Sequence, residues 1–385
     1  MKLLLAINNL ETGGAESFFC RFAHQLAEMG HQVWIWQLFY PNENHKYVEM
    51  LKHENIYEFS IHNNEIQHLC HYPNGIKSWI IRRKVNKKIK QLGIQLVNSH
   101  LFEADYFISM HIDLPQVVSM HGSYEMYYQY PAIFKRDSIF RNLDFHKIVR
   151  FVLSKVNHLV LASEKNKIII DSLAIKVPNT KIYYGIDAYN GKQKQKSEMR
   201  SLGLLSRGLA TKGWRIAIES CQSGRLLYQN DIRLVLGYTS SPYMEQLRQE
   251  FGHLEWIEWI KDVEDSGEFF NSIDLLLFPT KYPAESLPNV VIESLNLGVP
   301  VFSTSIGEIP LMLDSEKGTA GFLLDYQLDD EVLINNFAEA INRVSNDSNW
   351  YQQLRTNAIC AANKFILSAS ANHYLTLFNK VLHEK

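Results

Sequence analysis

Short apolar runs alternate along the whole chain with longer segments of helical periodicity, and the alternation forms two series. In the first series the runs that predict strands are Leu3–Ile7, His31–Leu38, Ile94–Asn98, Gln116–Met120 and His158–Ala162. In the second series they are Ser201–Leu205, Ile232–Leu236, Leu254–Trp259, Asp274–Phe278 and Pro300–Ser303. Strand–helix–strand order at this spacing predicts parallel sheets with crossover helices.

A polar segment without apolar period, Ala188–Met199, separates the two series and predicts a linker or surface loop. A chain of 385 residues is also too long for one ordinary core. We therefore expect an α/β fold of two doubly wound, Rossmann-like domains that face a cleft. The expected N-terminal domain spans 1–190 and the expected C-terminal domain spans 191–365. The last segment, 366–385, is expected to form a helix that packs back on the N-terminal domain.

The composition excludes several classes of protein. The formal net charge of -2 argues against a nucleic-acid binder, which would carry a strongly basic domain. The four cysteines have no CxxC spacing, so neither a zinc site nor a disulfide framework is indicated. The apolar run Met1–Ile7 is too short for a signal peptide or a membrane-spanning helix. We expect a cytoplasmic protein, with a position at the inner face of the cell membrane left open.

Two glycines and a histidine are candidate site residues of the first series. Gly13 and Gly14 lie between the first strand and the first helix, where the backbone approaches a ligand closely and the helix N-terminus attracts an anion. A purely steric role for these glycines is an equal alternative. His121 follows the strand Gln116–Met120, at an end where it would contact a sugar or a phosphate. A structural histidine is again the alternative.

The second series carries two further candidates. Arg207 and Lys212 follow its first strand and would clamp a diphosphate, unless they are ordinary surface cations. Glu285 and Glu293 flank a predicted helix start near Ser286–Pro288, after the strand Asp274–Phe278. Carboxylates accept hydrogen bonds from adjacent hydroxyl groups, and N–H groups at a helix start bind phosphate. The helix start itself is formed by Ser286, Leu287, Pro288 and Asn289.

The segment Lys77–Lys90 interleaves seven cations with Trp79 and three isoleucines. If it is helical, it is basic and amphipathic, and such helices lie on anionic membranes. The favoured interpretation is a crossover helix whose solvent face is basic, and peripheral membrane contact through 77–90 is the alternative.

The order of these motifs resembles the family-4 glycosyltransferases, which are retaining enzymes of the GT-B architecture. The resemblance spans Lys2 to about Leu324, and its most specific element is the spacing of Glu285 and Glu293. The motifs that carry it are Gly13–Glu16, His121-Gly122, Gly185–Asp187, Arg207 with Lys212-Gly213, Glu285–Glu293 and Gly298–Pro310.

The resemblance implies roles for single residues. Arg207 and Lys212 would bind the donor diphosphate, Glu293 would hold the nucleotide ribose, and Glu285 would contact the donor sugar near the reacting carbon. Gly14 would lie against the diphosphate or sugar, and His121 would touch the sugar. The family needs no metal, and we therefore expect no cofactor.

Several positions depart from the family pattern. Glu308 stands where a second glycine is frequent, Leu311 replaces a glutamate, and Tyr184 replaces an asparagine. The usual aspartate–histidine pattern near an N-terminal strand is reduced to Asn98-Ser-His100.

The function expected from the resemblance is transfer of a hexose from a nucleoside-diphosphate sugar to a hydroxyl group of a glycan or lipid-linked acceptor. We expect a role in cell-surface polysaccharide synthesis, such as lipopolysaccharide, O-antigen or capsule, because many members of the family that the chain resembles have one and because the segment Lys77–Lys90 is basic. Two rivals are a nucleotide-sugar epimerase of similar fold and a non-catalytic nucleotide-sugar-binding subunit. The four charged candidates Arg207, Lys212, Glu285 and Glu293 argue against the second.

Overall fold

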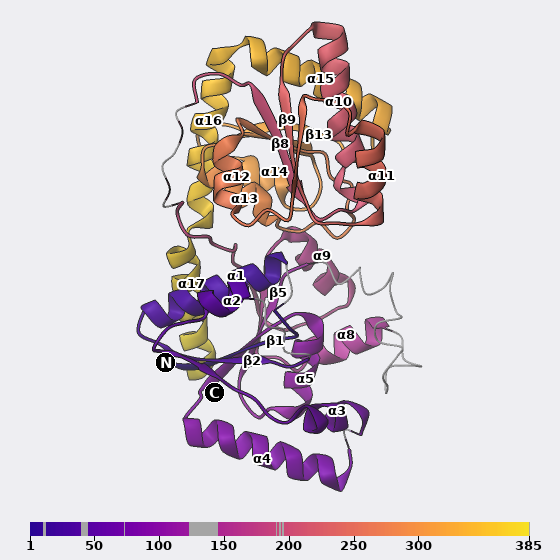
Figure 1. Cartoon of the computed structure of the whole chain (residues 1–385). Coiled ribbons are helices and arrows are strands. Elements are labelled where there is room, and N and C mark those ends of the chain that lie inside the picture. Colours follow the sequence, from indigo (N-terminus) through magenta and orange to yellow (C-terminus); the bar gives the residue numbers. More distant parts are fainter. Residues whose placement is uncertain are drawn as a thin grey trace. The chain divides into compact units, whose positions relative to one another are not determined.

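The computed structural model describes residues 1–10, 13–39, 45–72, 74–122, 145–189, 191, 194 and 196–384. The chain forms two compact units (Figure 1). The N-terminal unit comprises Met1–Asp187 together with Ile366–Lys385, and the C-terminal unit comprises Ala188–Phe365. Each unit is a parallel sheet with helices, so the prediction of two Rossmann-like domains is confirmed.

The N-terminal unit contains a seven-stranded parallel sheet in the order β3-β2-β1-β4-β5-β6-β7. Its strands are β1 (Lys2–Ile7), β2 (Gln32–Gln37), β3 (Ile56–Glu58), β4 (Leu96–His100), β5 (Gln116–Met120), β6 (His158–Leu161) and β7 (Asn179–Lys181). Its helices are α1 (Gly14–Glu28), α2 (His45–Met50), α3 (Asn63–His71), α4 (Ile76–Leu92), α5 (Phe102–His111), α8 (Phe145–Leu153), α9 (Glu164–Ser172) and α17 (Leu367–His383).

The two faces of this sheet differ in chemistry. Since side chains alternate along a strand, Val97 of β4 packs in an apolar cluster with α3, α4 and α5, whereas Asn98 and His100 project to the other face. There His100 contacts aromatic rings of α1, including Phe18 and Phe19. Parallel strands buried on both faces are usually apolar throughout, so these buried polar side chains require specific partners.

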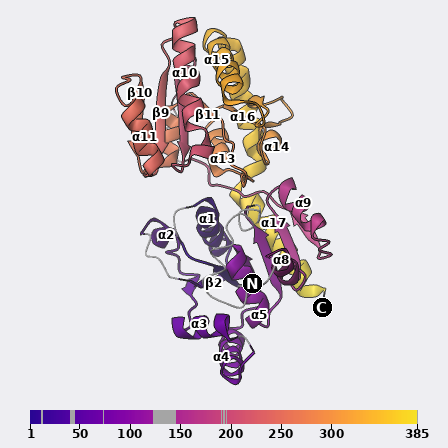
Figure 2. The ribbon, with the colours of Figure 1, turned by 90° about the vertical axis from the view of Figure 1, so that its right-hand side faces the viewer.

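The C-terminal helix α17 belongs to the N-terminal unit (Figure 2). Ile186 forms a β-bridge with Ile366, and a side chain at Gly185 would collide with the backbone of Leu367. Tyr374 of α17 then packs on Phe22 of α1 with ring centroids 4.6 Å apart. The close approach of the Leu367 backbone explains why a glycine stands at position 185.

The C-terminal unit contains a six-stranded parallel sheet in the order β10-β9-β8-β11-β12-β13. Its strands are β8 (Ser201–Ser206), β9 (Arg233–Tyr238), β10 (Ile257–Lys261), β11 (Leu275–Phe278), β12 (Val301–Thr304) and β13 (Gly321–Leu324). Its helices are η1 (Ala210–Lys212), α10 (Trp214–Tyr228), α11 (Pro242–Phe251), α12 (Ser266–Ser272), α13 (Asn289–Asn296), α14 (Ile309–Leu313), α15 (Asp330–Asn346), α16 (Ser348–Ala362) and η2 (Asn363–Phe365).

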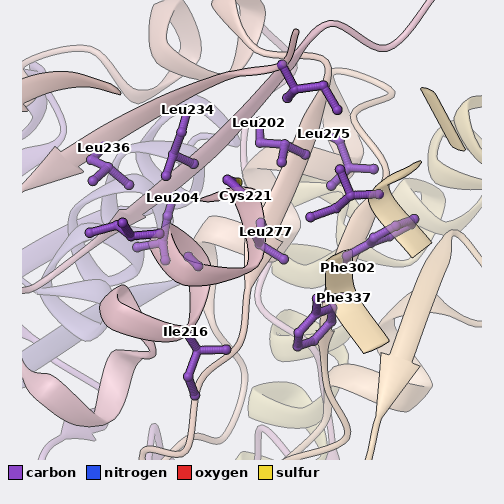
Figure 3. Close-up of a cluster of buried hydrophobic side chains, with 14 of the residues drawn as sticks. Leu202, Leu204, Ile216, Cys221, Leu234, Leu236, Leu275, Leu277, Phe302 and Phe337 are labelled. Atoms are coloured by element: carbon purple, nitrogen blue, oxygen red, sulfur yellow. The ribbon is translucent and has the colours of Figure 1, made fainter. Parts of the chain in front are cut away.

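The C-terminal sheet carries an apolar cluster on the face covered by α10, α11 and α15, with α12, α13 and α14 on the other face (Figure 1). Figure 3 shows side chains of neighbouring strands meeting those of the helices, and it labels Leu202, Leu204, Leu234, Leu236, Leu275, Leu277, Phe302, Ile216 and Phe337. Burial of these side chains fixes the sheet, and therefore the positions at which its strands end.

All ten predicted strands are present, with bounds shifted by up to three residues. The strands β3, β7 and β13 were not predicted, because they have three or four residues and no fully buried face. The segment Ala188–Met199, predicted as a linker or surface loop, is buried near its end. Lys196 is buried and donates hydrogen bonds to the carbonyl groups of Phe270 and Ile273 at the end of α12, and Met199 is buried as well.

Candidate functional site

The C-terminal sheet reverses its strand order at β8, because the chain continues to β9 on one side and later returns to β11 on the other. In open α/β sheets, ligands bind at such a point, outside the carboxyl ends of the strands. Arg207 and Lys212 follow β8, and Tyr282 and Glu285 follow β11. The topology therefore brings together two pairs of residues, one after each strand, that lie about 75 positions apart in the sequence.

Lys212 and Glu285 form a buried ion pair at this point. The Nζ atom of Lys212 lies 2.6 Å from Oε2 of Glu285, and each side chain is 7% exposed. The hydroxyl group of Thr280, at the end of β11, donates a second hydrogen bond of 3.1 Å to the same carboxylate oxygen. Burial lowers the pKa of Lys212, Glu285 opposes this shift, and Arg207 adds to it. No hydrogen bond within the described residues reaches Oε1 of Glu285, which leaves that oxygen available to a ligand.

Arg207 and Lys212 share the ring of Tyr282. The guanidinium carbon of Arg207 lies 5.5 Å from the ring centroid, and Nζ of Lys212 lies 4.3 Å from it. Such cation–π contacts hold a cation in place without neutralising its charge. Arg207 is exposed and forms no ion pair within the part of the chain that the structure describes. Its positive charge is therefore open to an anion.

Two glycines hold the loops of the site at close range. Gly213 has φ of +79° and precedes α10, and a side chain there would collide with the carbonyl group of Pro279. Gly307 has φ of +59°, and a Cβ atom would lie 2.5 Å from the carbonyl oxygen of Glu285. These are backbone conformations and distances that favour glycine. The loop that carries Glu285 is thus fixed by its backbone neighbours.

The residue after Gly307 is Glu308, where the family often has glycine. Its backbone N–H donates a 2.9 Å hydrogen bond to the carbonyl group of Ser286, and its side chain is buried. A backbone contact does not depend on the side chain. The hydrogen bond that holds the turn at Ser286 is therefore kept, although glutamate replaces glycine at position 308.

Helix α13 begins at Asn289, one residue after the predicted helix start near Ser286–Pro288. Pro288 is the N-cap, with φ of -70° and ψ of 119°, because its extended ψ places it before the helix. Pro288 has no side-chain group that could cap the helix, and Ser286, Leu287 and Pro288 are buried. Glu293 lies in the second turn and is half-buried. The positive end of a helix dipole attracts an anion.

In the N-terminal unit, Gly13 is the N-cap of α1 and has no side chain that could cap the helix. The hydroxyl group of Tyr47 lies 3.4 Å from the N–H and 3.2 Å from the carbonyl oxygen of Gly13. Gly14 is the first residue of α1 and is exposed. Tyr47 therefore holds the glycine turn from one side, and no motif in the sequence indicates this role.

His121 follows β5 and forms a hydrogen-bonded pair with His100 at the end of β4. The Nε2 atom of His121 lies 2.6 Å from Nδ1 of His100. Phe18 of α1 contacts both rings, and Tyr184 stacks on Phe18 at 4.5 Å. Burial lowers the pKa of His121 to about 3 and that of His100 well below its ordinary value. Both rings are therefore neutral at physiological pH.

The structure groups the predicted residues by unit. Gly13, Gly14 and His121 belong to the N-terminal unit, and the candidates from Arg207 to Glu293 belong to the C-terminal unit. The segment Gly122–Ile139 is rich in tyrosine, which makes it a candidate determinant of specificity, but beyond Gly122 it lies outside the described residues. Among the residues described, no group of three or more histidine, cysteine, aspartate or glutamate side chains is arranged to hold a metal ion.

The sequence matches two family models, one in each unit. The model for glycosyltransferase family 4 matches residues 12–188, and the model for glycosyl transferases group 1 matches residues 201–347. The chain is a family-4 glycosyltransferase. Its two Rossmann-like domains are those of the GT-B fold. Curated proteins gave no match to the sequence.

Solved structures of glycosyltransferases share this fold over their whole length. HepE from Anabaena, solved with UDP, is 16% identical, with a TM-score of 0.74 over 99% of this chain and 100% of that chain. Sucrose-phosphate synthase from Thermosynechococcus elongatus is 15% identical, with a TM-score of 0.72 over 100% of both chains. WaaG, a glycosyltransferase involved in lipopolysaccharide biosynthesis, is 14% identical, with a TM-score of 0.63 over 98% of this chain and 99% of that chain. At these identities the likeness concerns the fold alone.

Proposed function

We propose that this glycosyltransferase moves a hexose, with retention of configuration, from a nucleoside-diphosphate sugar to a hydroxyl group of a glycan or lipid-linked acceptor. The observation that carries the proposal is the group formed by Arg207, Lys212 and Glu285 at the point where the C-terminal sheet reverses. It combines two cations with a carboxylate oxygen, Oε1 of Glu285, that has no hydrogen-bond partner among the described residues. A diphosphate attached to a sugar has the matching anions and hydroxyl groups.

The structures of related fold support this class of donor. HepE was solved with UDP, with UDP and glucose, and with UDP-glucose. The pneumococcal O-GlcNAc transferase GtfA, of which this chain covers 60%, was solved with UDP and GlcNAc. We infer that UDP-sugars are the first donors to test on this enzyme.

In the proposed reaction the two cations act on the leaving phosphate. Arg207 binds the diphosphate from the exposed side, and Lys212 offers it the protons that Glu285 does not use. Positive charge that is already in place stabilises the negative charge that develops as the glycosidic bond breaks. The leaving phosphate then helps to deprotonate the attacking hydroxyl group on the same face of the sugar. Because protein cations neutralise the diphosphate, the proposed reaction uses no metal ion.

The two glutamates have separate parts in the proposal. Glu285 accepts a hydrogen bond from a hydroxyl group of the donor sugar through Oε1, while Lys212 and Thr280 hold its other oxygen. Glu293, half-buried in the second turn of α13, accepts hydrogen bonds from the ribose diol. The N-terminus of α13 begins between them in the sequence, and in the proposal its dipole attracts a phosphate.

Acceptor-dependent release of the nucleotide tests the proposal through Glu285→Gln. This change keeps the size of the side chain but removes its charge and its ion pair with Lys212. We expect kcat/KM to fall about a hundredfold, the scale at which a group that acts on the transition state contributes. Glu316→Gln, an exposed position of the same domain, is the control and should change the rate less than twofold. A wild-type rate in Glu285→Gln would remove the assigned role.

Helix α4 favours an acceptor that lies on a membrane. It packs on the N-terminal core through Ile81, Val85 and Ile89, as a crossover helix does. Its outer face, however, exposes apolar groups as well as charge: Ile76 is 83% exposed, Trp79 58% and Ile80 54%. The exposed cations beside them are Lys77, Arg83, Lys84, Lys87, Lys88 and Lys90.

A purely solvated helix face has no need of exposed tryptophan and isoleucine. Apolar side chains that enter a bilayer and cations that meet anionic headgroups explain both. No helix in the described part of the chain is long and apolar enough to span a membrane. We therefore infer that the enzyme binds the membrane surface through α4 and acts on a lipid-linked glycan of the cell surface.

Co-sedimentation with vesicles tests the role of α4. We expect binding to vesicles that contain anionic lipid, and a loss of at least fivefold in binding for Trp79→Ser combined with Ile80→Ser, because each change removes a membrane-inserted apolar group. Ile168→Ser, at an exposed position of α9 that is 67% accessible, is the matched control. Equal binding by the double variant and the control would contradict the assignment.

A further inference from the structure

A chain of polar side chains crosses the buried face of the N-terminal sheet beneath α1 and α17. Tyr374 of α17 lies 3.0 Å from Oγ of Ser119, and Ser119 accepts a 3.0 Å hydrogen bond from Asn98. Oδ1 of Asn98 lies 2.8 Å from Nε2 of His100, and Nδ1 of His100 lies 2.6 Å from Nε2 of His121. Each link restricts where the protons of the next residue lie.

The orientation of Asn98 fixes the proton of His100. The amide nitrogen of Asn98 lies 2.9 Å from the carbonyl oxygen of Val117, which only accepts hydrogen bonds. The NH₂ group therefore points to Val117 and Ser119, and Oδ1 points to His100. An oxygen that accepts requires a donor, so Nε2 of His100 carries a proton.

The proton of His100 in turn fixes that of His121. His100 is fully buried and contacts aromatic rings, and burial keeps it neutral with a single proton. Since that proton is on Nε2, its Nδ1 atom is an acceptor, and His121 donates to it from Nε2. His121 is neutral as well, so its Nδ1 atom carries a lone pair.

The Nδ1 atom of His121 is buried, and within the described residues it has no hydrogen-bond partner. A buried acceptor without a donor costs free energy that a ligand recovers. Phosphate oxygens at neutral pH offer only lone pairs and would repel this atom, whereas a hydroxyl group donates a proton to it. The position is also right for a ligand, since His121 follows the carboxyl end of β5.

We propose that Asn98 and His100 are positioning residues that hold His121 in the Nε2–H tautomer, so that its Nδ1 atom accepts a hydrogen bond from a hydroxyl group of the donor sugar. The inference rests on the proposed function for the identity of the ligand only. His121 thereby selects a hydroxyl group over a phosphate and orients the sugar. Because Nδ1 is buried in the free chain, the sugar must displace the groups that cover it.

The ¹⁵N resonances of the imidazole rings test the tautomer in the ligand-free enzyme, because protonated and unprotonated ring nitrogens differ strongly in shift. We expect both His100 and His121 as Nε2–H at pH 7. A proton on Nδ1 of His121 would overturn the proposal. This measurement needs no sugar nucleotide, so its outcome is independent of whether the proposed function holds.

Asn98→Asp tests the relay itself. A carboxylate beside Nε2 of His100 favours the imidazolium, which donates from both nitrogens and forces His121 to accept through Nε2 and to carry its proton on Nδ1. We expect the spectrum of His121 to show this reversal, and kcat/KM to fall about tenfold as the acceptor is lost. Ser119→Ala is the matched control, because Val117 still orients Asn98, and we expect its tautomer to be unchanged and its rate to change less than twofold. If Asn98→Asp folds and keeps His121 as Nε2–H, the relay is wrong.

Addition of ligands tests the partner of Nδ1. We expect UDP-glucose, but not UDP alone, to shift the Nδ1 resonance of His121 upfield, since a hydrogen bond from the sugar shields the lone-pair nitrogen. An equal shift with UDP alone would assign the contact to the nucleotide and overturn the choice of a sugar hydroxyl group. If the enzyme transferred the sugar of a donor that leaves the Nδ1 resonance of His121 unchanged, the contact with a sugar hydroxyl group would also be wrong. The proposed function would still hold in that case.

Discussion

At the scale of single residues, the buried pair of Lys212 and Glu285 is the feature whose removal has the sharpest consequence. Lys212→Met would leave the Glu285 carboxylate buried with Thr280 as its remaining protein partner. We expect the free energy of unfolding to fall by about 3–5 kcal/mol, the range measured when one partner of a buried ion pair is removed. Urea unfolding followed by tryptophan fluorescence measures it.

Two variants control this prediction. Arg215→Met breaks ion pairs with Glu219 and Glu250 at the surface, where Arg215 is 43% exposed, and should cost less than Lys212→Met because exposed ion pairs contribute little. Combining Lys212→Met with Glu285→Gln should restore part of the lost stability, because the unpaired charge is gone. If Lys212→Met cost no more than Arg215→Met, the pair would not be buried as the structure has it.

The sequence predicted which single residues belong to the site, but not which side chains pair with one another there. Arg207, Lys212 and Glu285 each follow a predicted apolar strand, so their position at a strand end was predictable. That Lys212 and Glu285 pair with each other was not, because the pairing depends on β8 and β11 being neighbours. Likewise His121 stood out by its place after β5, whereas its bond to His100 depends on the register of β4 and β5.

At the scale of elements, the turn between β12 and α14 holds the loop that carries Glu285. Gly307→Ala places a Cβ atom 2.5 Å from the carbonyl oxygen of Glu285 and forces a non-glycine residue to φ of +59°. We expect donor affinity to fall about tenfold or more, because the loop must move. Calorimetric titration with the donor measures it.

Gly30→Ala separates the strain of a positive φ from the collision with a neighbouring carbonyl group. Gly30 has φ of +81° at the end of α1, and no atom lies within 4 Å of a Cβ atom placed there. This variant therefore carries only the backbone strain, about 1–2 kcal/mol, and should bind the donor as the wild type does. Equal loss of donor affinity in both variants would show that the contact with Glu285 has no part.

The elements that the sequence missed share a physical reason. The strands β3, β7 and β13 are edge strands, and each pairs with one neighbour. They have three or four residues and none is fully buried, so their formation depends on the sheet beside them. The central strands β1, β8 and β11 have buried residues on both faces and were visible as apolar runs.

At the scale of the whole molecule, the two domains should respond differently to acid. The C-terminal domain contains one of the 15 histidines, His253, whereas the N-terminal domain contains His100, His111 and His121, whose pKa values burial lowers, to about 3 for the last two. A histidine with a lowered pKa in the folded state stabilises the fold above its unfolded pKa, near 6.5. That stability is lost as the pH falls towards 3.

Each such group contributes a slope of about 1.4 kcal/mol per pH unit below pH 6.5. We therefore expect the N-terminal domain to lose protection from hydrogen exchange at a higher pH than the C-terminal domain between pH 6.5 and 4. Mass spectrometry of peptides from the two domains resolves this. Simultaneous loss of protection would mean that the buried histidines are not neutral in the fold.

The central claim is that a nucleoside-diphosphate sugar binds where the C-terminal sheet reverses, on the exposed charge of Arg207. The most direct measurement is thermal unfolding of the wild type and of Arg207→Ala with a panel of UDP-sugars and other nucleoside-diphosphate sugars. A ligand at 100 times its Kd stabilises the folded state by about 2.7 kcal/mol. We predict that at least one donor raises the Tm of the wild type by several degrees, and that Arg207→Ala keeps the wild-type Tm without ligand but loses most of this shift. An equal shift in both proteins would place the donor elsewhere and contradict the claim.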